Sequence, residues 1–233
     1  MPLPAAALFD MDGLLVETES IWFRAETEIV DELGGWWGEE LSESVLGGPI
    51  ERAVRCMIEH AGGEHDELVV RQMLMSRMGD LLRTEPIHWQ PGARTLLLAL
   101  QGAGVPMALV SASWRPVVDA VMVAALDDLG RDIFVTTVAG DDLPRTKPHP
   151  DPYLEAARRL GVGVRECVVL EDSPTGAQAG VASGAYVVAV PSLVPVPAAP
   201  GLRVVQSLSE LTPELLGAWS QAWHAGTDAR ITR

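Results

Sequence analysis

The sequence predicts an α/β fold, a parallel-sheet core interrupted by an inserted all-α domain. A short apolar run at residues 5–9 ends abruptly in acidic residues, as a buried parallel strand does. From residue 93 onward, strand and helix patterns alternate, which is typical of a parallel sheet. The region between them shows only helical patterns. The core is therefore predicted to comprise residues 1–16 and 90–233, and the inserted domain residues 17–89.

The inserted region is predicted to begin with a helix over residues 20–33. Its apolar residues recur on one helical face, and Gly34 with Gly35 ends it. Further helices are predicted at 50–61 and 66–83. Because the chain must cross between the domains twice, residues 16–18 and 87–90 are the predicted hinges.

The remaining core elements follow from the alternation of strand and helix patterns. Helices are predicted at 93–102, 115–126, 152–160 and 174–183, with a terminal helix from Ser209. Strands are predicted at 106–110, 133–138, 166–170, 186–190 and 203–206, with a proline-rich loop at 191–200 before the last one.

Composition and charge exclude several classes of protein. The 233 residues are 48% hydrophobic and carry a formal net charge of −15, which argues against nucleic acid or an anionic membrane as partner. No apolar run is long enough for a membrane helix, and no secretory signal is evident. Cys56 and Cys167 are expected to be buried free thiols in a reducing cytoplasm. No obligatory protein partner is evident.

The first predicted strand ends in Asp10-Met11-Asp12-Gly13, which points to a site at the carboxyl edge of the sheet. Ligands of open α/β sheets bind at that edge. Two carboxylates so close together need a cation, and Mg²⁺ prefers such oxygen ligands. A surface turn is the competing interpretation. A calcium-binding loop is excluded, because Leu14 and Leu15 stand where that loop needs Asp or Asn and then Gly.

Three later segments repeat this construction, with polar residues directly after or near a strand end. Ser111 follows one strand, where a hydroxyl and backbone amides suit a phosphate, although the nearby Ser113 can be explained as a helix N-cap. Lys147 is the chain's single lysine beside sixteen arginines, and a compact ammonium can pair with a phosphate and a carboxylate together. Glu171 and Asp172 follow another strand, and helix capping does not require two successive acids.

In this order, the motifs resemble those of the haloacid dehalogenase superfamily. Phe9-Asp10-Met11-Asp12-Gly13, Lys147-Pro148-His149-Pro150-Asp151 and Leu170-Glu171-Asp172-Ser173-Pro174 look like its β-phosphoglucomutase-like phosphatase branch. The resemblance covers nearly the whole chain. It implies a Rossmann-like parallel-sheet core with an inserted all-α helical cap domain.

The resemblance also implies a mechanism and a set of roles. Asp10 would attack the phosphorus of a phosphomonoester and form an aspartyl-phosphate intermediate. Asp12 would protonate the leaving oxygen and then deprotonate water. The implied ligands of Mg²⁺ are Asp10, the Asp12 carbonyl and Asp172. The implied phosphate-binding groups are Ser111, Lys147 and the amides of Met11, Asp12 and Ala112, with Glu171 orienting water or Lys147 from behind them.

Three positions depart from the family pattern. Glu17 stands where Asp is frequent, and Ala112 replaces a frequent Asn but needs to supply only an amide. In Leu46-Gly47-Gly48-Pro49-Ile50-Glu51-Arg52, Glu51 occupies the place of an arginine that mutases offer to a second phosphate. Arg52 could substitute for it, although an exposed arginine is the simpler interpretation. Three tryptophans, Trp22, Trp36 and Trp37, could form a sugar-binding wall, although packing between cap helices explains them more simply.

The sequence therefore predicts a cytoplasmic, Mg²⁺-dependent phosphatase acting on a small phosphorylated metabolite, with sugar and polyol phosphates as candidates. A phosphomutase is the first alternative, disfavoured by the lack of a cap cation at Glu51. A dehalogenase would have no use for an acid at Asp12. A non-catalytic phosphate-binding protein would not need both Asp10 and Asp12.

Overall fold

The computed structural model of the chain describes residues 2–45 and 50–226. Within them, six parallel strands form one sheet in the order β3-β2-β1-β4-β5-β6. Their bounds are β1 (Ala6–Phe9), β2 (Met107–Val110), β3 (Thr136–Val138), β4 (Cys167–Glu171), β5 (Tyr186–Ala189) and β6 (Leu202–Val204). The chain moves outward from β1 on one side and then resumes at β4 on the other. The strand order thus reverses between β1 and β4, and such a point is where ligands bind in open α/β sheets.

Helices cover both faces of the sheet. One face packs against α5 (Ala93–Gly102), α6 (Arg115–Leu129) and α9 (Pro213–His224), and the other against α7 (Asp151–Leu160) and α8 (Pro174–Ser183). In β1, Ala7 and Phe9 enter the first of these cores, whereas Ala6 and Leu8 enter the second. All four are buried, which explains why the strand is apolar at every position.

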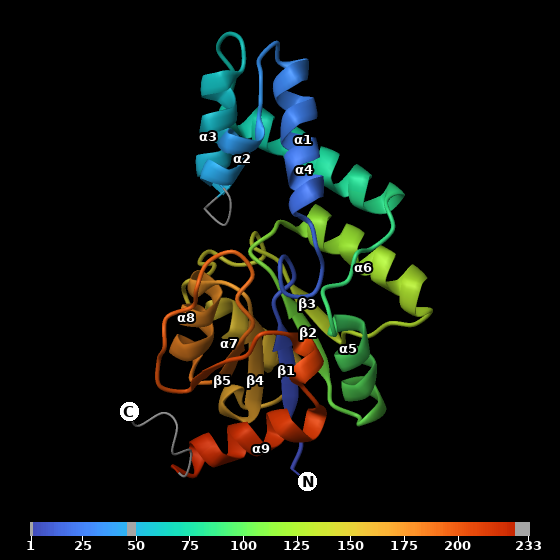
Figure 1. Cartoon of the computed structure of the whole chain (residues 1–233), viewed down its shortest axis with the longest axis vertical. Helices are drawn as coiled ribbons and strands as arrows, with labels where there is room; N and C mark the ends of the chain where they lie inside the picture. The colour runs from blue at the N-terminus through green and yellow to red at the C-terminus, as the bar shows by residue number, and fades with distance from the viewer. Residues whose placement is uncertain (1, 46–49, 227–233) are drawn as a thin grey trace.

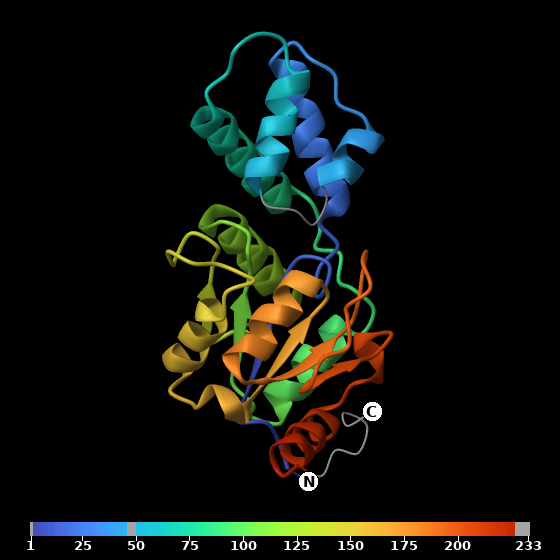
Figure 2. The same cartoon turned by 90° about the vertical axis from the view of Figure 1, so that its left-hand side faces the viewer.

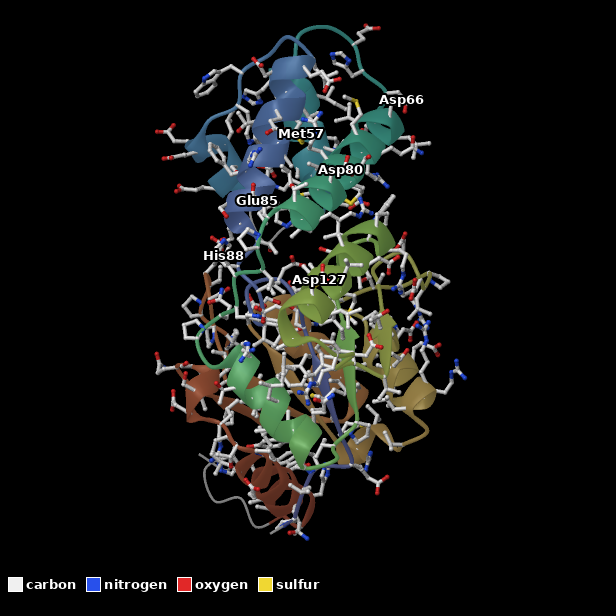
Figure 3. The ribbon with its side chains drawn as sticks, turned by 90° about the vertical axis from the view of Figure 1, so that its right-hand side faces the viewer. Met57, Asp66, Asp80, Glu85, His88 and Asp127 are labelled. Atoms are coloured by element: carbon white, nitrogen blue, oxygen red, sulfur yellow. The ribbon has the colours of Figure 1, made fainter. Side chains whose placement is uncertain are left out.

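A separate group of helices lies beyond the carboxyl edge of the sheet, as Figures 1 and 2 show. It consists of α1 (Glu19–Glu32), α2 (Glu39–Val45), α3 (Ile50–His60) and α4 (Glu67–Thr84). Apolar side chains such as Ile29, Met57 and Leu74 are fully buried among these helices, and Figure 3 shows Met57 there. Towards the core, α4 packs against α6.

Two chain segments connect these helices with the sheet, and they hydrogen-bond to each other. The amide of Glu17 donates to the carbonyl of His88 (2.8 Å), and the amide of Gln90 donates to that of Leu15 (2.8 Å). Figure 3 shows His88 between the two groups of elements. The domain limits at residues 17 and 89 remain a prediction, and so does the use of these segments as hinges.

The predicted fold class is confirmed, with a few differences in detail, among them that the helix expected at 115–126 continues to Leu129. The strand expected at 133–138 begins only at Thr136, and Ile133 and Phe134 precede it with their side chains buried in the core, where Phe134 meets Phe9 edge to face at 6.2 Å. The terminal helix begins at Pro213 rather than Ser209. The helix α2 was not predicted as a separate element.

The late start of α9 has a local cause. Ser207 and Glu210 form a capping box around a short 3₁₀ helix, Leu208–Glu210, that precedes α9. Thr212 then caps α9, and its hydroxyl accepts a hydrogen bond from the amide of Leu215 (3.2 Å). Among the described helices, none combines the length and apolar character that crossing a membrane requires.

Candidate active site

The predicted site residues converge at the carboxyl edge of the central strands. Asp10 follows β1 and Ser111 follows β2, whereas Glu171 ends β4 and Asp172 follows it. The loop between β3 and α7 brings Lys147 to the same place. All five side chains are buried, although four are ionisable and the fifth carries a hydroxyl. Burying so many polar groups is costly unless each is paired, so their pairing defines what the site can do.

Lys147 bridges two of the carboxylates. Its ammonium donates to Asp10 Oδ1, to Glu171 Oε1 (2.6 Å) and to the carbonyl of Val110 (2.7 Å), so each of its three N–H bonds has an acceptor. Its side chain is only 4% exposed. Burial alone would lower the pKa of Lys147, but the charges of Asp10 and Glu171 outweigh burial and raise it. The lysine is therefore a fixed positive charge beside Asp10.

Glu171 has all its accepting capacity directed at protein donors. Besides Lys147, Oε1 accepts from the hydroxyl of Tyr153 (2.5 Å), while Oε2 accepts from the amide of Asp172 and the hydroxyl of Ser173 (3.2 Å each). Gly176 packs so closely that an added Cβ would lie 1.8 Å from Oε1. The geometry makes Glu171 an anchor for Lys147 rather than an open ligand.

Asp10 and Asp172 have fewer hydrogen-bond donors around their carboxylate oxygens than Glu171 has. One oxygen from each of Asp10, Glu171 and Asp172 lies within 4.8 Å of the others. Burial, and then the charge of Glu171, raises the pKa of Asp10 well above its usual range and that of Asp172 to about 7. The three carboxylates and Lys147 together carry a net charge of −2 when all are ionised. A divalent cation with oxygen ligands matches both the charge and the donor type, so these residues fit Mg²⁺.

Two neighbours hold Asp172 in position. The hydroxyl of Ser192 donates to Asp172 Oδ2 (2.5 Å). Gly13 lies against the same oxygen, and an added Cβ there would be 2.3 Å away. Gly13 also has φ +78°, a conformation that favours glycine. The glycine of the first motif therefore both makes the turn and leaves room for the carboxylate of the last one.

The carboxylate of Asp12 is hydrogen-bonded to three hydroxyl groups rather than to Lys147. Its Oδ1 accepts from Thr18 (2.7 Å), and its Oδ2 accepts from Ser113 (2.9 Å) and Ser111 (3.3 Å). Ser113 is not the helix N-cap that was considered for it, because α6 begins one residue later with Trp114 as N-cap. The two aspartates of the first motif thus have separate environments, as two different roles would require.

The other predicted phosphate-binding positions lie in the loops after β1 and β2. Met11 is fully buried, and its carbonyl accepts from the amides of Leu15 (3.0 Å) and Val16 (3.2 Å), which closes the loop after β1. Ala112 is exposed between Ser111 and Ser113. Their predicted use of backbone amides toward a phosphate remains a prediction.

The cap residues are arranged differently from the expected pattern. Arg52 donates to the carbonyl of Ser44 (2.7 Å) and so is held within the helical group. Glu51 lies 3.6 Å from Arg71 on α4, whose guanidinium stacks on Trp114 of the core (5.2 Å to the ring centroid). Positions 46–49 of the cap motif fall outside the described residues. Arg71, which sequence reasoning did not single out, is thus a cap arginine that reaches the core near the site.

The cap tryptophans have different environments. Trp37 is buried and donates its Nε1–H to Glu26 (3.0 Å), which also accepts from Ser42 (2.6 Å). Trp22 is half-buried against the core cluster, and Trp36 is 70% exposed. Packing therefore explains the presence of Trp37 fully and that of Trp22 in part.

Two cavities lie where the helical group meets the core. The larger, about 310 Å³, lies between α4 and the start of α6, and its lining includes Gln72, Ser76, Arg83, Trp114 and Asp141. Trp114 follows Ser113 directly, so this cleft begins one residue from a hydrogen-bond donor to Asp12.

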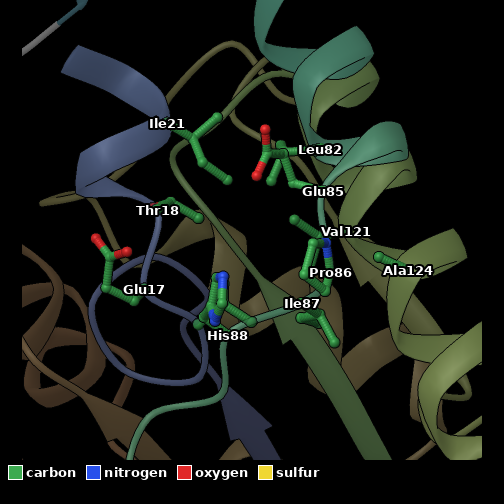
Figure 4. Close-up of a pocket in the computed structure, with 11 residues that line it drawn as sticks. Glu17, Thr18, Ile21, Leu82, Glu85, Pro86, Ile87, His88, Val121 and Ala124 are labelled. Atoms are coloured by element: carbon green, nitrogen blue, oxygen red, sulfur yellow. The ribbon is translucent and has the colours of Figure 1, made fainter. Parts of the chain in front are cut away.

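The smaller cavity lies at the connecting segments, where Figure 4 shows Thr18 and His88 on the two segments, with Leu82 of α4 and Val121 of α6 nearby. Its volume of about 10 Å³ leaves space for no more than one water. It is too small to bind a substrate.

Sequence reasoning did not assign to the site four residues that contact it: Tyr153, Thr18, Ser192 and Ser113, the last of which was considered only as a helix N-cap. Tyr153 lies six residues after Lys147, at the start of the helix that the same motif opens, so its position could have been noticed. Thr18 was considered only as part of a hinge. Ser192 lies in a proline-rich loop that carried no recognisable pattern.

Comparisons with known proteins agree with the geometry. The family model described as haloacid dehalogenase-like hydrolase matches residues 4–184. Hexitol phosphatase B of Escherichia coli K12 is 34% identical over 191 residues, 80% of this chain and 83% of that protein. The bifunctional riboflavin kinase/FMN phosphatase of Arabidopsis thaliana is 31% identical over 200 residues, 82% of this chain, and the chain spans about half of that protein (49%).

A solved structure has a similar arrangement. The crystal structure of CbbY from Rhodobacter sphaeroides in complex with phosphate superposes with a TM-score of 0.78 at 27% identity, covering 90% of this chain and 96% of the other.

Proposed function

Because the chain belongs to the haloacid dehalogenase-like hydrolase family, we propose that it is a Mg²⁺-dependent phosphatase that hydrolyses a small phosphomonoester. The proposed substrates are sugar or polyol phosphates. The observation that carries the proposal is the buried cluster in which Lys147 bridges Asp10 and Glu171 beside Asp172.

In the proposed first step, a carboxylate oxygen of Asp10 attacks the phosphorus, and the bond from phosphorus to the leaving oxygen breaks. Lys147, already on Asp10 Oδ1, favours the ionised form of the nucleophile, which burial and the charge of Glu171 disfavour, and contributes positive charge for the phosphoryl oxygens. Ser111 can donate to the same group from the end of β2. The product of this step is an aspartyl-phosphate on Asp10.

Asp12 is the proposed acid and base. It gives a proton to the leaving alcohol, and in the second step it takes a proton from the water that attacks the aspartyl-phosphate, so its protonation state is restored. Ser113 and Thr18 hold its two oxygens (2.9 and 2.7 Å). Free inorganic phosphate and the ionised Asp10 result.

Mg²⁺ would be held by Asp10 and Asp172, with the carbonyl of Asp12 as the third proposed protein ligand, and when bound it would neutralise charge on the nucleophile and the phosphoryl oxygens. Ser192 and Gly13 fix the orientation of Asp172 for this purpose.

The surroundings of Arg71 support a monoester with a neutral leaving group over the bisphosphate that a phosphomutase must bind. Glu51 partly neutralises Arg71, and Arg52 is engaged with Ser44. The cleft beside Trp114 offers an aromatic face and uncharged polar groups from Gln72 and Ser76, which suit a polyhydroxylated chain. The polyol specificity in the name of the Escherichia coli relative supports the same class.

We propose the cytoplasm as the compartment. Cys56 and Cys167 are both free thiols, although only Cys167 is buried as expected and Cys56 is partly exposed, and a reducing compartment would maintain them.

The test is release of inorganic phosphate from a panel of hexose, pentose and polyol monophosphates, assayed with Mg²⁺ and with EDTA. Mg²⁺-dependent release from members of the panel supports the proposal. Isomer interconversion without release would favour the phosphomutase, and binding without either reaction would favour a non-catalytic phosphate-binding protein.

A further inference from the structure

Tyr153 contacts the proposed catalytic residue Lys147 and its partner Glu171. It is in the first turn of α7 and fully buried. Its hydroxyl donates to Glu171 Oε1 (2.5 Å), and its ring centroid lies 5.1 Å from Lys147 Nζ. One side chain therefore contacts both partners of a buried ion pair.

The hydroxyl of Tyr153 and the ammonium of Lys147 share a single acceptor oxygen. Lys147 Nζ approaches Glu171 Oε1 to 2.6 Å, and the tyrosine hydroxyl approaches the same atom to 2.5 Å. On Oε2, the amide of Asp172 and the hydroxyl of Ser173 complete the set at 3.2 Å each. The hydrogen bond from the Tyr153 hydroxyl is one of the two shortest of these four. Its loss would therefore leave Oε1, the oxygen that contacts Lys147, less firmly held.

The position of Lys147 depends on a balance between its two carboxylates. If Glu171 Oε1 loses its second donor, more negative charge on that oxygen is left for the ammonium, which is then drawn toward Glu171 and away from Asp10. The ring of Tyr153 limits this movement from one side and attracts the cation. Loss of the tyrosine hydroxyl would therefore change the position of the lysine relative to Asp10.

We propose that Tyr153 is a positioning residue of this enzyme: by saturating Glu171 Oε1, its hydroxyl keeps Lys147 against Asp10. The inference rests on the proposed function for its kinetic consequence, but the position of Lys147 itself can be measured without substrate. The expected kinetic signature is a lower kcat with little change in KM, because the lysine stabilises charge that develops in the transition state.

The experiment compares Tyr153→Phe with Tyr186→Phe. The chain has two tyrosines, and both are fully buried. Tyr186 opens β5 and pairs with Val168 near the start of β4, whereas Glu171 lies at the other end of that strand. Each variant removes one buried hydroxyl and keeps the ring, so only the first changes the surroundings of Glu171.

The first readout is steady-state hydrolysis of the best substrate of the phosphate-release panel. Tyr153→Phe is expected to lower kcat about tenfold, the effect of losing one hydrogen bond to a charged group. KM should stay within about threefold of the wild-type value. Tyr186→Phe should leave both constants near wild type.

The second readout uses the fact that the chain has a single lysine. Lysine labelled with ¹³C and ¹⁵N gives one side-chain ammonium signal, that of Lys147 Nζ. Tyr153→Phe is expected to shift this signal in the substrate-free protein, and Tyr186→Phe to leave it in place. A shift in a protein that hydrolyses nothing on the panel would support the positioning role while refuting the proposed function.

Two results would overturn the inference. The first is a Tyr153→Phe protein whose ammonium signal and kcat both match those of Tyr186→Phe. The second is a Tyr153→Phe protein that fails to fold while Tyr186→Phe folds, since the hydroxyl would then serve stability rather than the position of the lysine.

Discussion

Replacing Lys147 by Met tests how far the site depends on its one buried cation. The substitution keeps much of the side-chain volume but removes the ammonium that Asp10, Glu171 and the carbonyl of Val110 share. Removing one partner of a buried ion pair costs about 3–5 kcal/mol. For a chain of this size that corresponds to a melting temperature lower by about 6–20 °C. Loss of a donor to the transition state should also reduce kcat at least about 100-fold.

The measurements are thermal unfolding by circular dichroism in EDTA and phosphate release with Mg²⁺. Arg145→Met is the matched control, because Arg145 lies two residues away, has a 63% exposed side chain and pairs with Asp151 at the surface. Its change should alter stability by no more than about 1 kcal/mol. If Lys147→Met melted within about 2 °C of wild type and retained its kcat, the pairing of Lys147 with Asp10 and Glu171 would be important for neither stability nor catalysis.

Three further predictions concern Asp12, its neighbour Thr18, and a buried acid of the cap. Asp12→Asn should lower the rate of hydrolysis of alkyl phosphates by about 10²–10⁴-fold. The leaving group of p-nitrophenyl phosphate needs no proton, so the same variant should release a stoichiometric burst of nitrophenolate from it in rapid mixing. Absence of this burst would argue against Asp12 as acid and base. Thr18→Val removes the hydroxyl that donates to Asp12 Oδ1 (2.7 Å) and should lower kcat by up to about tenfold with little change in KM. An equal loss for Ser20→Ala, which removes a surface hydroxyl in the first turn of α1, would exclude a specific effect. Burial raises the pKa of Glu26 despite hydrogen bonds from Ser42 and Trp37, so ionisation of Glu26 destabilises the folded state. The wild type should therefore lose stability relative to Glu26→Gln as pH rises above the ordinary Glu pKa. A difference in melting temperature between the two proteins that stays constant from pH 4 to 7.5 would contradict this.

The fold could be predicted from the sequence because its signals are local and repeated. Each buried strand is a short apolar run, and most of the site residues lie at the carboxyl end of such a run, so the parallel topology brings them together. Asp10, Ser111 and Asp172 needed only this rule. Lys147 follows no strand directly, but it was identified as a candidate site residue because it is the only lysine in the sequence.

What could not be predicted depends on contacts between distant elements. Tyr153 reads as an ordinary buried aromatic until the structure brings its hydroxyl to Glu171. Arg71 reads as a helix-surface arginine until α4 meets Trp114. Arg52 was considered as a ligand of substrate from its place in the motif, and its bond to Ser44 follows from the packing of α2 on α3, which no periodicity encodes.

Chemical trapping can detect the proposed covalent step on Asp10. The enzyme is mixed with a substrate of the panel and Mg²⁺, quenched within one turnover and treated with borohydride, which reduces an aspartyl-phosphate to homoserine. Mass spectrometry of the peptide that contains Asp10 and Asp12 is then expected to find homoserine at position 10, in an amount that follows the intermediate through the turnover. Unmodified aspartate at position 10 throughout an active turnover, or homoserine at position 12 instead, would show that Asp10 is not the nucleophile.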